Sequence, residues 1–264
     1  MPPITPLLSR RWVNHQGVAR SVPVACLIGS LLLGTLAVYH SKRQAFPLID
    51  LWALQIKSYS VTIWSGGLFR MAIGAVPFLL PLLFQIGFGL SAFSAGLLVL
   101  AVFAGNLAMK PFTSAILYRF RFRPTLLVNG LLNAATLLAC ALITPTTPHI
   151  LIIILLFISG LTRSMQFTAL NTLAFSEVPA PKMAGANTLS NMAQQLAVGL
   201  GIAIGALSLR IAEWFHPYRD GTIPLENFQI AFVVIGLVAL LSVVDTFTLS
   251  RDAGDAVRKK PAKR

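Results

Sequence analysis

Four ionisable side chains interrupt long apolar stretches of this sequence: Arg70, Lys110, Arg163 and Asp245. A charge near the centre of a bilayer is costly, so such a residue inside a membrane span is a candidate for function. Lys110 and Asp245 stand near the ends of their stretches, where a side chain can reach the interface or pair with a loop charge. Arg70 and Arg163 stand near the middle. A guanidinium there either lines a polar cavity or hydrogen-bonds neighbouring carbonyl groups and helix ends.

Two apolar stretches also have a polar face. At about 100° per residue, Gln166 and Asn171 fall on the same side of a helix as Arg163. The next stretch has a longer polar face, formed by Asn187, Ser190, Asn191, Gln194 and Gln195. A face of this kind cannot point at lipid. It points either at water in a cavity or at a neighbouring helix, with which it forms hydrogen bonds.

Other kinds of chemistry find little support in the sequence. The histidines fall in tails, loops or at helix ends: His15, His40, His149 and His216. No embedded cluster of His, Asp or Glu could bind a metal or catalyse hydrolysis, and no glycine-rich phosphate loop occurs. The cysteines, Cys26 and Cys140, stand in apolar runs and are expected to be small buried hydrophobic residues. We therefore expect no enzyme, cofactor, metal site or disulfide framework.

The elements that must position these residues follow from the composition. Of the 264 residues 56% are apolar and only 11% are charged, whereas soluble domains have about 25% charged residues. A soluble fold of this length could not cover so much apolar surface, and a disordered chain would be far more polar. The sequence therefore predicts an all-α polytopic membrane protein.

Seven stretches are long and apolar enough, or nearly so, to form a transmembrane helix of about 20 residues. They cover residues 22–39, 59–86, 91–117, 124–143, 149–175, 186–209 and 228–249. The first is the shortest and weakest. The second contains Pro77 and Pro81, which would bend it, and we expect these prolines to have a conformational role.

The domain organisation predicted from these stretches has five parts. They are a basic N-terminal tail (1–21), an extra linker helix (22–39), a cytoplasmic loop (40–58), a six-helix bundle (59–250) and a basic cytoplasmic tail (251–264). Residues 67–70 and 160–163 share the pattern G-L-x-R, each at the start of a group of three spans. Three spans followed by three inverted spans is the repeat found within one half of a major facilitator transporter.

The excess of basic residues predicts the orientation. The formal charge is +13, which in a soluble protein would suggest nucleic-acid binding. Here 13 of the 21 Lys and Arg residues fall on one side of the predicted spans and five on the other. By the positive-inside rule, the basic side and the C-terminus are cytoplasmic. We expect a multi-pass protein of the inner, or plasma, membrane that binds no nucleic acid.

Several segments resemble the fourteen-span drug:proton antiporter branch of the major facilitator superfamily over about residues 30–250. They are Phe46–Leu51, Phe69–Arg70, Val76–Phe78, Gln166–Leu173 and Ala186–Leu189. The segment 118–123 stands where that family has a cytoplasmic loop signature. The acid and the glycine of the signature are missing, although Arg119, Arg121 and Arg123 could still contribute to gating.

This resemblance implies a C-terminal six-helix bundle whose first and fourth helices line a central cavity. It places Arg70, Arg163, Gln166 and Asn171 at the cavity, and Asn187, Asn191 and Gln194 at the cavity or between the two halves. Residues 1–21 do not resemble the family. The implied function is proton-coupled efflux of small molecules.

The resemblance also implies partners beyond the lipid bilayer and a small-molecule substrate. The chain is interpreted as the C-terminal part of a split, truncated or partly sequenced transporter, which needs a separate N-terminal half or a second copy of itself. The alternative is a remnant or accessory membrane subunit that does not transport.

Overall fold

The computed structural model describes residues 51–217, 223–250 and 254, together with residues 28–30, 32, 34–36 and 39. The chain divides into two units, Met1–Ile49 and Asp50–Arg264, which are considered separately. In the first unit the described residues are helical and fall within the predicted helix 22–39. The rest of that helix, the tail 1–21, loop residues 40–50 and the tail 251–264 apart from Gly254 lie outside the described residues.

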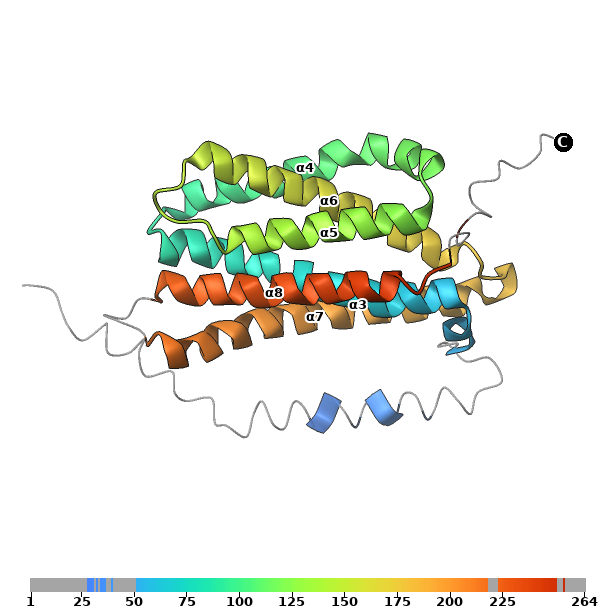
Figure 1. Ribbon diagram of the computed structural model, residues 1–264. Coiled ribbons are helices and arrows are strands. Elements are labelled where there is room, and N and C mark those ends of the chain that lie inside the picture. Colours follow the sequence, from blue (N-terminus) through green and yellow to red (C-terminus); the bar gives the residue numbers. More distant parts are fainter. Residues whose placement is uncertain are drawn as a thin grey trace, which may run out of the picture. The chain divides into compact units, whose positions relative to one another are not determined.

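Six long α-helices make up the described part of the second unit (Figure 1). They are α3 (Lys57–Leu82), α4 (Ala92–Arg119), α5 (Phe122–Cys140), α6 (His149–Phe175), α7 (Met183–Phe215) and α8 (Leu225–Thr246). Short helices precede α3 (η1, Leu51–Gln55) and α7 (η3, Ala180–Lys182), and the π-helical turn η2 (Leu83–Gly87) continues α3. No strand occurs among the described residues, which confirms the all-α fold class.

Five helical segments in the described residues are long and apolar enough to cross a membrane. They are Lys57–Gly87, Ala92–Arg119, His149–Phe175, Ala180–Phe215 and Leu225–Thr246. The predicted span 124–143 corresponds to α5, which does not meet this criterion by itself. Its 19 residues include Asn129 and Asn133, which lower its hydropathy but are buried against other helices.

The turn from α3 to α4 is encoded by local sequence. Pro77 and Pro81 lie inside α3, which stays helical through both and then widens into η2. Gly89 reverses the chain with a φ of 68°, a conformation that glycine adopts without a steric penalty. The side chain of Ser91 then caps α4 by accepting a hydrogen bond from the Ser94 amide at 3.2 Å.

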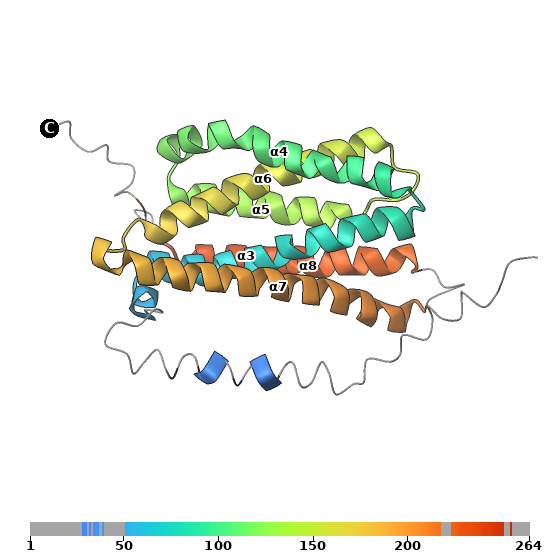
Figure 2. The ribbon, with the colours of Figure 1, turned by 180° about the vertical axis from the view of Figure 1, so that it is seen from behind.

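Two closely packed helix pairs form the centre of the unit, and α5 and α8 pack on them and on each other. Helix α4 packs on α6 and α3 packs on α7, while α5 packs on α6 and α8, and α8 also packs on α3 and α7 (Figures 1 and 2). If α3–α5 and α6–α8 are inverted repeats, the pair α3–α7 corresponds to the pair α6–α4, and both pairs pack closely. The pair α7–α8 corresponds to α4–α5. However, α7 packs along α8, whereas α4 and α5 each pack on α6 rather than on one another.

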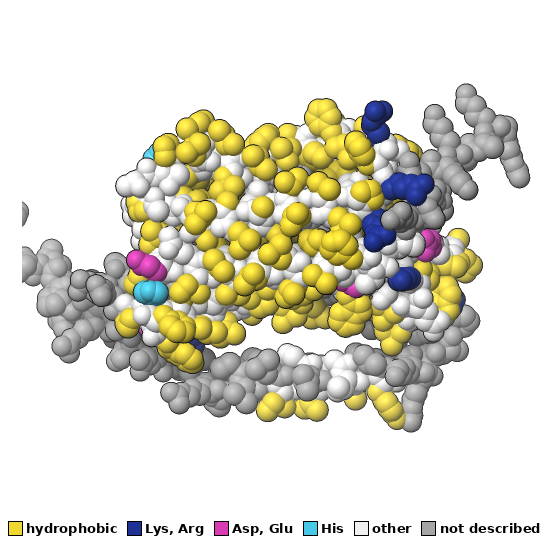
Figure 3. Space-filling model, in the orientation of Figure 1, with side chains coloured by type: hydrophobic (Ala, Val, Ile, Leu, Met, Phe, Trp, Pro, Cys, Tyr) yellow, Lys and Arg dark blue, Asp and Glu magenta, His cyan; other side chains and the backbone are white. Residues whose placement is uncertain are grey.

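Glycines permit the closest helix crossings. A Cβ atom on Gly105 of α4 would overlap the backbone carbonyl of Phe157 in α6, and one on Gly201 of α7 would overlap the carbonyl of Met71 in α3. The surface of the unit is mainly hydrophobic. Basic side chains gather at the end of the unit where the chain turns from α4 into α5 (Figure 3). This distribution suits a helical bundle surrounded by lipid.

Candidate functional site

The central candidate is a pocket of about 410 Å³ between α3, α6 and α7, which we call the α3–α6–α7 pocket. It contains the two arginines that the sequence singles out. Its lining consists of Arg70, Ile73, Gly74, Pro77 and Phe78 from α3, Arg163 and Phe167 from α6, and Val198 and Ile202 from α7. The two G-L-x-R segments therefore bring their arginines to one cavity, although 93 positions separate them in sequence.

Arg70 is held firmly at the wall of this pocket. Its side chain is only 4% exposed, and its Nη2 donates a 2.8 Å hydrogen bond to Oδ1 of Asn171. Its guanidinium carbon lies 5.1 Å from the ring centre of Phe167, close enough for a cation–π interaction. A Cβ on Gly66 would come within 2.6 Å of Nη1, so the absence of a side chain there leaves room for the guanidinium.

The hydrogen bonds of Arg70 are incomplete. Its Nε is buried and has no partner in the described part of the chain. A guanidinium offers five N–H donors, and a buried donor without an acceptor is unfavourable. The hydrogen-bonding capacity of Arg70 is therefore only partly used by the described residues.

Arg163 faces the same pocket from α6 and is partly buried. Its guanidinium makes no hydrogen bond or ion pair with the described residues. The acidic residues that the structure describes all lie at or just beyond helix ends: Glu177, Glu213, Glu226 and Asp245. Within the described chain the pocket therefore has two cations and no nearby carboxylate to balance them.

The polar face of α7 extends from this pocket toward the N-terminal end of the helix. Asn187, Asn191 and Gln194 share one face of α7 with the pocket residues Val198 and Ile202. Asn187 and Asn191 are exposed, and Gln194 donates a 3.1 Å hydrogen bond to Ser190 of the same helix. The adjoining face of α7, which includes Ala197 and Gly201, is buried.

Gln166 does not lie with this group. It is 2% exposed, and its side chain interacts with α5. Asn129 donates to the Gln166 Oε1 at 3.0 Å and to the Thr162 carbonyl at 2.7 Å, while Asn133 donates to the Thr162 hydroxyl at 3.3 Å. Gln166 thus forms part of a polar connection between α5 and α6 and does not line the α3–α6–α7 pocket.

Sequence reasoning did not identify Asn129 and Asn133. The available signal was two asparagines four positions apart in an apolar run, a spacing that puts both on one helix face. Because such a face cannot point at lipid, it could have been recognised as a contact with another helix.

The residues predicted to act in conformational change lie in two places, the prolines inside α3 and the arginines around the turn from α4 to α5. Pro77 is exposed at the α3–α6–α7 pocket, and Pro81 is partly buried one turn later. Arg119 ends α4 and Arg121 immediately precedes α5, both with exposed side chains. Arg123 donates a 3.0 Å hydrogen bond to the carbonyl of Phe247, just after α8. Arg123 thus links the start of α5 to the end of α8.

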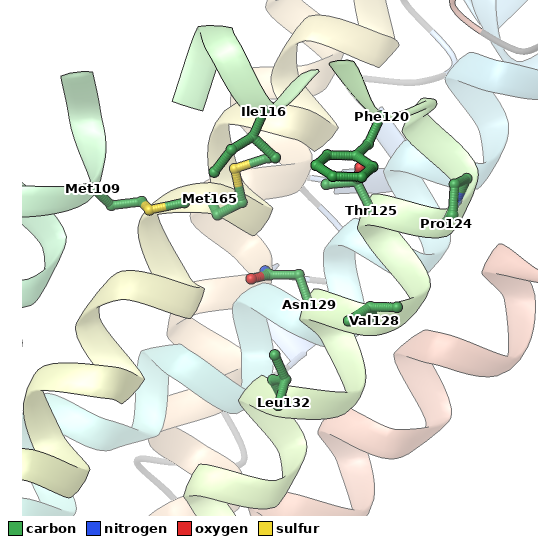
Figure 4. Close-up of a pocket in the computed structure, with 9 residues that line it drawn as sticks. All are labelled: Met109, Ile116, Phe120, Pro124, Thr125, Val128, Asn129, Leu132 and Met165. Atoms are coloured by element: carbon green, nitrogen blue, oxygen red, sulfur yellow. The ribbon is translucent and has the colours of Figure 1, made fainter. Parts of the chain in front are cut away.

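A second pocket, which the sequence did not suggest, lies between α4 and α5 and has a volume of about 310 Å³ (Figure 4). We call it the α4–α5 crevice. Its lining consists of Met109, Ile116, Phe120, Pro124, Thr125, Val128, Asn129, Leu132 and Met165. Met165 belongs to α6, so the gap between α4 and α5 is closed at its base by the helix on which both pack.

Comparison with known proteins gives two kinds of match. Residues 1–202 match the model of the Major Facilitator Superfamily. The match begins at residue 1, so the expectation that residues 1–21 do not resemble the family is wrong. Helix α8 lies beyond the matched range.

Several bacterial proteins align with most of the chain. A protein named as a multidrug resistance protein, MdtD, of Yersinia enterocolitica is 30% identical over 91% of this chain and 52% of its own length. A protein named as a transport protein, HsrA, of Haemophilus influenzae is 28% identical over 94% of this chain and 52% of its own. The chain therefore spans about half the length of these relatives.

Proposed function

The chain belongs to the Major Facilitator Superfamily, and on that basis we propose that its six-helix unit is the C-terminal bundle of a secondary transporter. The complete transporter would export small molecules in exchange for protons. The names of two relatives, a multidrug resistance protein of Yersinia enterocolitica and a transport protein of Haemophilus influenzae, support transport and drug-like substrates. The alternative is a membrane subunit that does not transport.

The observation on which this proposal rests is the pair of arginines at the α3–α6–α7 pocket. In transporters built from inverted repeats, substrates bind near the middle of the bilayer at the interface between repeats. Arg70 and Arg163 belong to the first helix of each predicted repeat and line one pocket. Their charge favours an anionic or zwitterionic substrate, or a carboxylate from another bundle.

The second bundle is part of the proposal. Alternating access requires two bundles that move about a site between them. The described acidic residues lie at helix ends, away from the pocket, so a carboxylate that transfers protons at the pocket must come from another part of the transporter. An N-terminal bundle, on the same or a separate chain, or a second copy of this chain would meet these requirements.

The proposed orientation of the chain in the membrane rests on the uneven distribution of Lys and Arg between the two sides of the predicted spans. Arg119 and Arg121, at the end of α4 and the start of α5, mark the cytoplasmic side of the inner membrane, and the C-terminus lies on that side. Fusion of a reporter that is fluorescent only in the cytoplasm after Arg264 tests this orientation. A dark fusion, with a periplasmic reporter active at the same position, would reverse it.

The transport proposal is tested in an efflux-deficient bacterial host that expresses the chain with and without an N-terminal bundle from a relative. We expect retention of a fluorescent dye to fall only when both bundles are present. Arg70→Ala should reduce efflux at least about tenfold, as expected when a charged hydrogen-bond partner is lost from a buried site. Arg210→Ala removes an exposed arginine from α7 and is the matched control.

Each result bears on a different part of the proposal. Transport by a demonstrated monomer of this chain would refute the need for a second bundle. Normal efflux by both Arg70→Ala and Arg70→Lys would refute the role of Arg70 in the pocket. Absence of efflux with every N-terminal bundle tried, despite membrane insertion, would favour the non-transporting subunit.

A further inference from the structure

The α4–α5 crevice plays no part in the proposed transport cycle, but its position and lining suit a ligand. We propose that it binds an acyl chain of an anionic phospholipid, whose phosphate group lies against the arginines around Phe120. The proposal concerns lipid binding alone and does not depend on whether the chain transports.

The crevice is open on its lipid side and apolar inside. Met109 and Ile116 of α4 face it from one wall, and Val128 and Leu132 of α5 face it from the other (Figure 4). Val128 is 61% exposed and Leu132 50% exposed, so the space between the helices is accessible from outside. In a bilayer an open apolar space of about 310 Å³ is filled by hydrocarbon rather than water.

The crevice exists because the two predicted repeats pack differently. Helices α7 and α8 pack against each other, whereas the corresponding helices α4 and α5 make little direct contact: α4 packs on α6, and α5 packs on α6 and α8. The space is therefore framed by three helices and has Met165 at its base. A groove framed in this way can retain one chain more specifically than the smooth surface of a single helix.

One end of the crevice is strongly basic. Phe120 and Pro124 line that end, and each is next in sequence to an arginine. The side chains of Arg119 and Arg121 are exposed on either side of Phe120. Neither α4 nor α5 contains an acidic residue, and basic side chains gather at this end of the bundle (Figure 3).

This arrangement matches the two parts of a phospholipid. An apolar slot alone would accept any hydrocarbon, and exposed arginines alone would attract any anion. The two together, with the cations at one end of the slot, fit a molecule that has an acyl chain and a phosphate. Phosphatidylglycerol has no cation in its headgroup to oppose the arginines, so we expect it to bind more tightly than phosphatidylcholine.

Fluorescence quenching by brominated lipids tests the proposal. Leu132→Trp is introduced into a chain whose native tryptophans, at positions 12, 52, 64 and 214, are replaced by Phe. The protein is reconstituted in phosphatidylcholine vesicles that contain brominated phosphatidylglycerol or, separately, brominated phosphatidylcholine. We expect the relative binding constant at position 132 to favour phosphatidylglycerol by at least about fivefold.

Two controls separate the crevice from the general lipid surface. Leu237→Trp places the reporter on α8 at a residue of similar exposure, 51%, and should be quenched equally by the two lipids. The double substitution Arg119→Gln/Arg121→Gln should abolish the preference at position 132. Arg210→Gln, which removes an exposed arginine from α7, should leave that preference unchanged.

Three results would overturn the proposal. They are equal quenching of Leu132→Trp by both lipids, no quenching by either because protein fills the crevice, and a preference that survives the double arginine substitution. Native mass spectrometry of the unsubstituted chain gives a second measurement if the tryptophan-free background fails to fold. There, phosphatidylglycerol should stay bound to the native chain but not to the chain with both arginines replaced.

Discussion

Helix α6 separates two cavities of opposite character. On one side, Arg163 and Phe167 face the α3–α6–α7 pocket, where two guanidinium groups have few partners. On another side, Met165 closes the apolar α4–α5 crevice, and the polar group of Gln166 is occupied by α5. Polarity alone therefore does not mark a site in this bundle. The unfilled hydrogen-bonding capacity of Arg70 and Arg163 sets the α3–α6–α7 pocket apart from the satisfied contact at Gln166.

The largest expected effect comes from adding a methyl group at the crossings that shape each cavity. Gly105→Ala pushes α4 away from α6, and Gly201→Ala pushes α7 away from α3, because each Cβ would overlap a backbone carbonyl. We expect each substitution to cost about 2–3 kcal/mol of stability by overpacking. Gly105→Ala should disturb lipid binding in the crevice more than anion binding in the pocket, and Gly201→Ala the reverse.

Thermal unfolding can be followed through the thiol of Cys140, which is 3% exposed and becomes reactive when the bundle opens. Cys26→Ser removes the other thiol. Gly96→Ala is the matched control on α4, because nothing lies within 4 Å of an added Cβ there. If Gly105→Ala and Gly201→Ala change both cavities equally, the two cavities are not independent.

An intermediate loss of stability is expected when the hydrogen bonds between α5 and α6 are removed. Gln166→Leu removes the acceptor of the Asn129 amide and should lower stability by about 1–3 kcal/mol. Efflux per correctly folded molecule, measured in the efflux-deficient host that expresses the chain together with an N-terminal bundle, should remain near wild type. Gln195→Leu, at an exposed position of α7, is the control and should have little effect on stability. A large loss of efflux at unchanged stability would return Gln166 to the cavity, where the sequence had placed it.

The smallest effect on stability is expected at Arg163. Since its guanidinium has no hydrogen-bond partner among the described residues, Arg163→Met should change stability by less than about 1 kcal/mol. Binding of an anionic fluorescent probe to the two-bundle transporter should nevertheless weaken, because half of the positive charge in the pocket is lost. Arg210→Met is the control. A stability loss as large as that of Gln166→Leu would show that Arg163 has a structural role.

Residues with unusual chemistry for their surroundings were the most predictable part of the site. Arg70 and Arg163 could be selected because a charge in the middle of an apolar run is rare and costly. Asn171 was selected from its helical spacing and does bind Arg70. Gln166 was selected by the same argument, but helical spacing gives only the approximate direction of a side chain. It does not say which neighbouring helix that side chain meets.

The sequence by itself determined that the chain forms apolar helices, because so few charges cannot cover a soluble fold of 264 residues. It also located the two central arginines and most helix ends, since these depend on local residue types. Only the tertiary structure decided which faces meet. It joined Arg70 and Arg163 in one pocket, directed Gln166 toward α5 and left α4 apart from α5. These outcomes depend on close contacts between distant segments, such as those at Gly105 and Gly201, and local sequence patterns do not specify such contacts.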